Sequence, residues 1–98
     1  KQKRRKSVMS QIAVNTDVMR QLGQCFVAVS HYLWDDQRPR IENLIAQLEH
    51  NWQGHSRARF EHLFAQWRHE VHEVVELGYE IGQHLEQTAQ AFENADNS

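Results

Sequence analysis

The chain has 98 residues, 40% of them hydrophobic, and a formal net charge of −2. This length allows one domain with one core, and the presence of only one proline and four glycines favours an all-helical protein over a sheet protein. The single cysteine, Cys25, excludes an intrachain disulfide and a four-cysteine zinc site, and its apolar helical setting predicts a buried thiol. No run of about 18 apolar residues occurs, so we expect no transmembrane segment.

The N-terminus differs in charge from the rest of the chain. Five of its first six residues are basic: Lys1, Lys3, Arg4, Arg5 and Lys6. We predict that residues 1–11 form a flexible basic tail, either native or an extension added for expression with Met9 as the natural start. The apolar stretch of a secretory signal peptide does not follow this run, so export would need a different targeting signal.

This basic arm supports an alternative function, that of a small helical nucleic-acid-binding or regulatory protein. Lysine and arginine side chains in residues 1–6 would neutralise phosphate groups. The rest of the chain disfavours this function, because residues 7–98 contain six arginines and thirteen acids. We therefore expect no nucleic-acid partner.

The first helix is predicted to begin near Asn15. Asn15, Thr16 and Asp17 offer side-chain acceptors for free amide groups and an acid near the positive end of the helix dipole. Apolar side chains then recur every three or four residues at Met19, Leu22, Phe26, Val29 and Leu33, and after a polar stretch the stripe resumes at Ile41, Leu44, Ile45 and Leu48. Pro39 removes a helical hydrogen bond and disfavours helical geometry at Arg38, so we expect a kink there. The alternative is two helices, with Pro39 in the first turn of the second.

A turn is predicted at the centre of the chain, where Asn51-Trp52-Gln53-Gly54 separates two helical patterns. Gly54 can adopt the left-handed backbone conformation at little steric cost. A solvated turn has little use for an indole, so we expect Trp52 to pack between the helix ends while its N–H finds a partner. Trp52 and Gly54 form the predicted turn motif.

The second arm is predicted to be one helix over residues 56–94. Its apolar and small residues follow one another at alternating steps of four and three, as in helical bundles. The predicted core or dimer stripe is Phe60, Phe64, Trp67, Val71, Val74, Ile81 and Leu85. Gly78 and Gly82 each weaken a helix by ~1 kcal/mol relative to alanine, so we expect another backbone to approach them closely.

A hairpin of two helices leaves much of this apolar surface in water. Two antiparallel hairpins can cover it by forming a four-helix bundle, and a twofold pair is the commonest homo-oligomer. The predicted fold is therefore an all-α helix-turn-helix hairpin that forms a homodimer.

No enzymatic or metal chemistry is expected. The segment His69-Glu70-Val71-His72-Glu73 differs from the HExxH zinc motif, because its histidines are three residues apart rather than four. We therefore assign no catalytic residue, no metal site and no cofactor.

These features resemble the WxG-type, early secreted antigenic target-like small proteins of type VII secretion systems. The resemblance rests on a helix start about 36 residues before Trp52, on Trp52-Gln53-Gly54 itself, and on a long second helix that begins with Arg59-Phe60 and ends in a polar tail. It covers residues 12–96, the predicted hairpin domain, and leaves residues 97–98 as a short tail.

The resemblance implies a protein made in the bacterial cytoplasm and exported folded as a dimer, without a cleaved conventional signal peptide. Related proteins carry a C-terminal aromatic-x-x-x-acid signal, generally with tyrosine first, and Phe92 and Asp96 have this spacing. Such a pair lies on one helix face, where a type VII secretion ATPase can read both side chains. Phe92 lacks the phenolic hydroxyl of tyrosine, and helix packing is its alternative role.

The dimer partner is a second copy or a related protein. A third function, as a folding or targeting partner of a larger toxin-like cargo, stays open.

Overall fold

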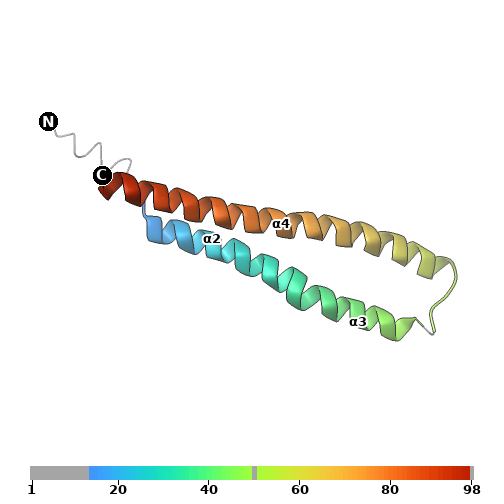
Figure 1. The fold of residues 1–98 in the computed structure, drawn as a ribbon. Helices are drawn as coiled ribbons and strands as arrows, with labels where there is room; N and C mark the ends of the chain where they lie inside the picture. The colour runs from blue at the N-terminus through green and yellow to red at the C-terminus, as the bar shows by residue number, and fades with distance from the viewer. Residues whose placement is uncertain (1–13, 50, 98) are drawn as a thin grey trace.

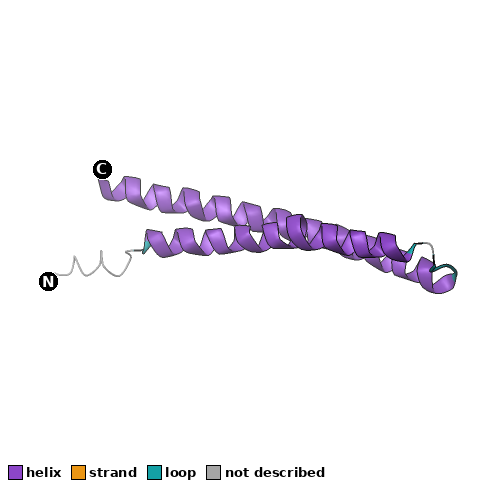
Figure 2. Ribbon diagram, turned by 90° about the horizontal axis from the view of Figure 1, so that it is seen from below, coloured by secondary structure: helices purple, strands orange, loops and turns teal. Residues whose placement is uncertain are grey.

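The structure, a computed structural model, describes residues 14–49 and 51–97, with side chains up to residue 95. The predicted basic tail and residues 12–13 of the predicted domain lie outside these ranges. The helices are α2 (Thr16–His31), the π-helix η1 (Tyr32–Gln37), α3 (Arg38–Leu48) and α4 (His55–Asn97). Figure 1 shows α2 and α3 in one arm that runs antiparallel to α4, and Figure 2 shows a single loop joining the arms. The described ranges contain no strand, and the predicted all-α hairpin is confirmed.

The first helix begins where the sequence predicts. Asn15 has an extended backbone, and its side-chain oxygen accepts a hydrogen bond from the N–H of Val18 at 3.1 Å. This cap satisfies one of the amide groups that have no partner within the helix, and Asp17 adds a negative charge to the first turn.

The first arm passes Pro39 without a break. Arg38 keeps helical angles, with φ −58° and ψ −50°, and Pro39 lies in the first turn of α3. The preceding turn is π-helical, because the N–H of Arg38 bonds to the carbonyl oxygen of Leu33, five residues back. Pro39 has no N–H to offer the carbonyl of Trp34, and Arg38 Nε donates to that oxygen at 3.1 Å instead. A single wide turn therefore accommodates the proline within one continuous helical arm.

A seam of small residues joins α2 to α4. A Cβ built on Gly23 would lie 3.2 Å from the carbonyl oxygen of Gly82, and one built on Gly82 would lie 3.1 Å from that of Gly23. Farther along, Ser30 Oγ donates to the carbonyl oxygen of Val75 at 2.9 Å, and Gly78 leaves room for the hydroxyl. These contacts confirm the close backbone approach predicted at Gly78 and Gly82.

The hydrophobic core of the single chain is small. Among the described residues, the apolar side chains that are buried are Val75 and Ala89, exposed by 1% and 0%. Cys25 is exposed, so the prediction of a buried thiol is wrong for this chain. Because Cys25 comes two residues after Gly23, it lies about 200° around α2 from the seam.

The two arms separate towards the turn (Figure 1). Between the described parts of α3 and α4 no pair of Cα atoms lies within 8 Å, whereas α2 packs closely on α4. We call residues 16–31 and 75–97 the narrow half of the hairpin, and residues 38–48 and 55–74 the wide half. In the wide half the arms meet through side chains, among them Arg68 Nε, which donates to Glu42 Oε2 at 2.7 Å.

Candidate protein-interaction surface

The predicted turn motif lies at the closed end of the wide half. Gly54 has a φ of +94°, in the left-handed region that favours glycine, and its carbonyl accepts a hydrogen bond from the N–H of Ala58 at 3.1 Å. The half-buried Trp52 donates from its indole Nε1 to Ser56 Oγ at 2.7 Å. Arg57 donates to the carbonyl oxygen of Trp52 at 3.0 Å. The turn is thus held by its own side chains and by the first residues of α4.

An aromatic row continues from the turn along α4. Ring centroids are 5.1 Å apart for Trp52 and Phe60, 5.9 Å for Phe60 and Phe64, and 5.9 Å for Phe64 and Trp67. Steps of three and four residues place the last three rings on one face of the helix. Because the backbone of α3 stands away here, the row stays partly open to solvent, and Trp67 is 38% exposed.

A second cluster surrounds Trp34 in η1, where the arms separate. The guanidinium carbons of Arg38 and Arg68 lie 4.5 and 5.1 Å from its ring centroid, and the ring of His72 meets it edge-on at 4.9 Å. Glu42 accepts hydrogen bonds from Arg38 at 2.8 Å and from Arg68 at 2.7 Å. The bond from Arg68 is the main cause of the lowered pKa of Glu42. The cluster connects the first arm to α4 through long side chains.

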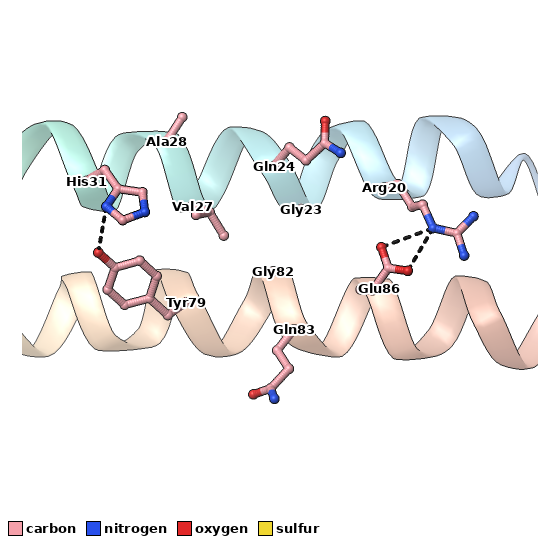
Figure 3. Close-up of a pocket in the computed structure, with 10 residues that line it drawn as sticks. All are labelled: Arg20, Gly23, Gln24, Val27, Ala28, His31, Tyr79, Gly82, Gln83 and Glu86. Atoms are coloured by element: carbon pink, nitrogen blue, oxygen red, sulfur yellow. Dashed lines mark hydrogen bonds and ion pairs between the residues drawn. The ribbon is translucent and has the colours of Figure 1, made fainter.

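One flank of the narrow half is polar. Arg20 donates to both carboxylate oxygens of Glu86, at 3.0 and 2.9 Å, and to Glu93 at 3.0 Å. Figure 3 shows the pair of Arg20 with Glu86 and the pair of His31 with Tyr79 reaching between the two helices, and His31 Nδ1 lies 3.2 Å from the Tyr79 hydroxyl oxygen. The hydrogen bond from Arg20 is the main cause that lowers the pKa of Glu93 to about 2. We define this polar flank as Arg20, Gln24, His31, Tyr79, Gln83, Glu86 and Glu93.

The opposite flank is apolar. On α4, Val74 and Ile81 directly precede Val75 and Gly82, which face α2. Tyr79 and Gln83 directly follow Gly78 and Gly82, so these two pairs of residues lie on opposite sides of the seam. Leu22 and Val29 occupy the same side of α2, exposed by 50% and 57%. We define this apolar flank as Met19, Leu22, Phe26, Val29, Leu33, Trp67, Val74, Leu77, Ile81, Leu85 and Phe92.

The seven predicted stripe residues fall into two groups. Trp67 and Val74 are exposed, and the other five are half-buried: Phe60, Phe64, Val71, Ile81 and Leu85. Their exposure places the stripe at the boundary between the packing of the two arms and the apolar flank. The stripe is therefore only partly covered within one chain.

The family of the chain follows from its match over residues 11–97 to WXG100, described as proteins of 100 residues with WXG. This range includes both arms and the Trp52-Gln53-Gly54 turn. The chain belongs to the WXG100 family. The match confirms the resemblance to WxG-type small proteins of type VII secretion. Searches of the curated proteins and of the solved structures found no match.

In this WXG100 protein the candidate export signal lies on the last turns of α4. Phe92 is 40% exposed and lines a shallow depression on α4, together with Thr88 and Ala91. Asp96 belongs to the same helix, and its side chain lies outside the described residues. The helical backbone puts positions 92 and 96 on one face, the arrangement that the predicted signal requires.

In the part of the chain that the structure describes, no group of three or more histidine, cysteine, aspartate or glutamate residues is arranged to hold a metal ion. Within the same part, no helix has the length and apolar composition needed to cross a membrane.

Sequence reasoning missed the residues that join the arms of this WXG100 protein. The ion pairs of Arg20 span 66 and 73 residues of sequence, so no local pattern reveals them. One contact of the Trp34 cluster could have been predicted, because Trp34 and Arg38 are four residues apart and can stack on one helix face. Its further members, Arg68 and His72, come from the other arm.

Proposed function

We propose that this WXG100 protein is a substrate or partner of a type VII secretion system and acts through protein recognition as an antiparallel homodimer. The observation that carries this proposal is the difference between the two flanks. Charged side chains of the polar flank pair within the chain, whereas Leu22, Val74 and Leu77 of the apolar flank are exposed by 50%, 57% and 55%. The apolar flank is thus the surface that gains most from a partner.

The energetics of the single chain support this assembly. Each large apolar side chain that becomes buried contributes about 1.5–3 kcal/mol, and the apolar flank supplies several such side chains on each arm. The buried apolar side chains of the described chain are only Val75 and Ala89. A four-helix bundle of two hairpins would give both chains the common core that each lacks.

The shape of the hairpin favours a second copy as the partner. The wide half carries the rings of Phe60, Phe64 and Trp67, while the narrow half has its helices in contact at Gly23 and Gly82. An antiparallel twofold pair places the wide half of one chain beside the narrow half of the other, which evens the thickness of the bundle. A related WXG100 protein with the same halves is the alternative partner.

Export is the second part of the proposal. The chain is made in the bacterial cytoplasm, and a secretion ATPase recognises Phe92 and Asp96 without a cleaved signal peptide. In the antiparallel dimer the C-terminal turns of one chain lie near the Trp52 turn of the other, so the recognised surface includes both chains. Nucleic-acid binding by the basic arm is not favoured, because the family match gives it no support.

A secretion assay in the source cell, with and without the type VII ATPase, tests this function. Phe92→Ala should abolish export, because it removes the aromatic group of the signal. Phe92 also belongs to the apolar flank, so sedimentation equilibrium of the variant accompanies the assay, and loss of export with the dimer intact identifies Phe92 as a signal residue. Val18→Ala is the matched control: Val18 is also an exposed apolar side chain, at 55%, but lies on α2 outside the signal. Unchanged export of Phe92→Ala would reject Phe92 as a signal residue. The mass of the exported complex separates a homodimer, a heterodimer and a cargo complex.

A further inference from the structure

The side of the first arm that faces α4 changes its register at η1. Gly23 and Ser30, seven residues apart, face α4. A seven-residue repeat continued along the arm would bring Gln37 and Leu44 to the same side. Instead Leu44 is 53% exposed. In α3, Arg38, whose side chain is 20% exposed, and Glu42 reach towards α4, and the half-buried Ile45 lies on the same side of the helix.

The π-helical turn explains this change. A π turn holds one more residue than an α turn, so every later side chain lags by about 100° around the helix axis. The lag directs Glu42 towards Arg68 of α4. It turns Leu44 and Leu48 outward, where they are exposed by 53% and 49%.

The same sequence has a second register available. If residues 32–37 were α-helical, the lag would disappear, and Ile41, Leu44 and Leu48 would face the aromatic row of α4. The hairpin would then bury its own wide half. In the observed register these three residues instead continue the side of the arm that carries Leu22 and Val29.

We propose that the π turn sets the register of α3, so that the outward side of α3 becomes an interaction surface for a second copy of the chain. It turns Leu44 and Leu48 away from their own α4 and extends the apolar flank along the whole first arm. The identity of the occupant rests on the proposed dimer, because this row is continuous with the apolar flank that the dimer buries. The inward charges support the same conclusion, since Glu42 pairs with both Arg38 and Arg68 and these charges leave the outward row apolar.

Pro39 and Arg38 stabilise the π turn. In an α-helix the ring of Pro39 would clash with the carbonyl of Asp35, four residues back, and the wide turn relieves this clash. Pro39 has no N–H to donate to the carbonyl oxygen of Trp34, and Arg38 Nε donates to this oxygen at 3.1 Å. The sequence Arg38-Pro39 thus favours the π turn both sterically and through hydrogen bonding.

Two variants of the full chain distinguish the effect of the register of α3 from the effect of losing the proline. Pro39→Ala removes the clash, so residues 32–37 become α-helical and α3 rotates towards α4. Pro39→Ala combined with deletion of Asp36 also lacks the proline and the π turn, but losing one residue restores the original phase of α3. The first readout is the dimer dissociation constant from sedimentation equilibrium. The second is the labelling rate of the thiol in Leu44→Cys, in a Cys25→Ser background, at a concentration where the chain is monomeric.

Pro39→Ala should raise the dissociation constant at least about tenfold and slow the labelling, because Leu44 and Leu48 leave the interface. The variant that also lacks Asp36 should keep both values close to those of the parent chain. Unchanged labelling in Pro39→Ala would overturn the role of the proline, and slowed labelling with an unchanged dissociation constant would overturn α3 as an interaction surface. A parent chain that never dimerises would refute the proposed dimer, while the labelling of the two variants would still decide the register.

Discussion

At Gly78 a single missing side chain sets the distance between the arms. A Cβ there would overlap Ser30 Oγ and would lie 3.3 Å from the carbonyl oxygen of Phe26. Glycine inside a helix is unfavourable by ~1 kcal/mol relative to alanine, so its presence indicated a close neighbour. Which neighbour it was could not be predicted, because Ser30 belongs to the other arm and has no local link to Gly78.

Gly78→Ala should therefore lower the free energy of unfolding by about 1–2 kcal/mol, since the overlap and the disturbed Ser30 hydrogen bond outweigh the gain in helix propensity. Urea unfolding followed by circular dichroism, at one fixed protein concentration, measures this change. Adding Ser30→Ala to Gly78→Ala removes the overlapping hydroxyl and should recover most of the loss. A more stable Gly78→Ala single variant would contradict the packing described for the seam.

At the scale of the elements, sequence patterns were reliable where a single helix decides the outcome. The cap at Asn15 and the uninterrupted second arm, predicted over residues 56–94 and observed as His55–Asn97, depend on local chemistry. At Pro39 the sequence left open a kink or a second helix with the proline in its first turn, and Pro39 lies in the first turn of α3. Proline rules anticipate the lost hydrogen bond, but the wide turn that absorbs it depends on the side chain of Arg38, on Trp34 and on contacts with α4.

The pairing of α2 with α4 should be sensitive to acid. The pKa of Glu93 is lowered from 4.5 to about 2, chiefly by Arg20, so its contribution to stability is complete above pH 4.5 and is lost as the pH falls towards about 2. Arg20→Gln should therefore be less stable than the parent chain near pH ~7, and the difference should shrink towards pH ~3. Thermal unfolding across this range measures it.

Arg59→Gln is the matched control for that series. Arg59 is exposed on α4, and no ion pair of this residue occurs in the described ranges. Its loss changes the net charge equally but should give a difference that does not follow the pH dependence of Glu93. If the stability of the two variants depends on pH in the same way, Arg20 acts only through the overall charge of the chain.

At the scale of the whole molecule, the hairpin has one flank whose charged side chains pair with one another and one flank that is apolar and exposed. Leu77→Glu places a carboxylate on the apolar flank and should raise the dimer dissociation constant at least ~tenfold, because an unpaired buried charge is strongly unfavourable. Gln83→Glu makes a similar change on the polar flank and should leave the constant nearly unchanged. Sedimentation equilibrium compares them. A thermally robust single-chain particle at high micromolar concentration would contradict the dimer.

The helical arms, the central turn and the family of this protein follow from its sequence alone. Helix caps, the spacing of apolar residues and the glycine of the central turn act over a few residues, and they are sufficient to predict a hairpin with Trp52-Gln53-Gly54 at its bend. Tertiary structure alone decided which residues meet across the arms. The partners of Arg20, the Trp34 cluster and the phase of α3 depend on how two distant segments approach each other, and Leu44 therefore faces outward although its spacing from Gly23 and Ser30 predicts the opposite.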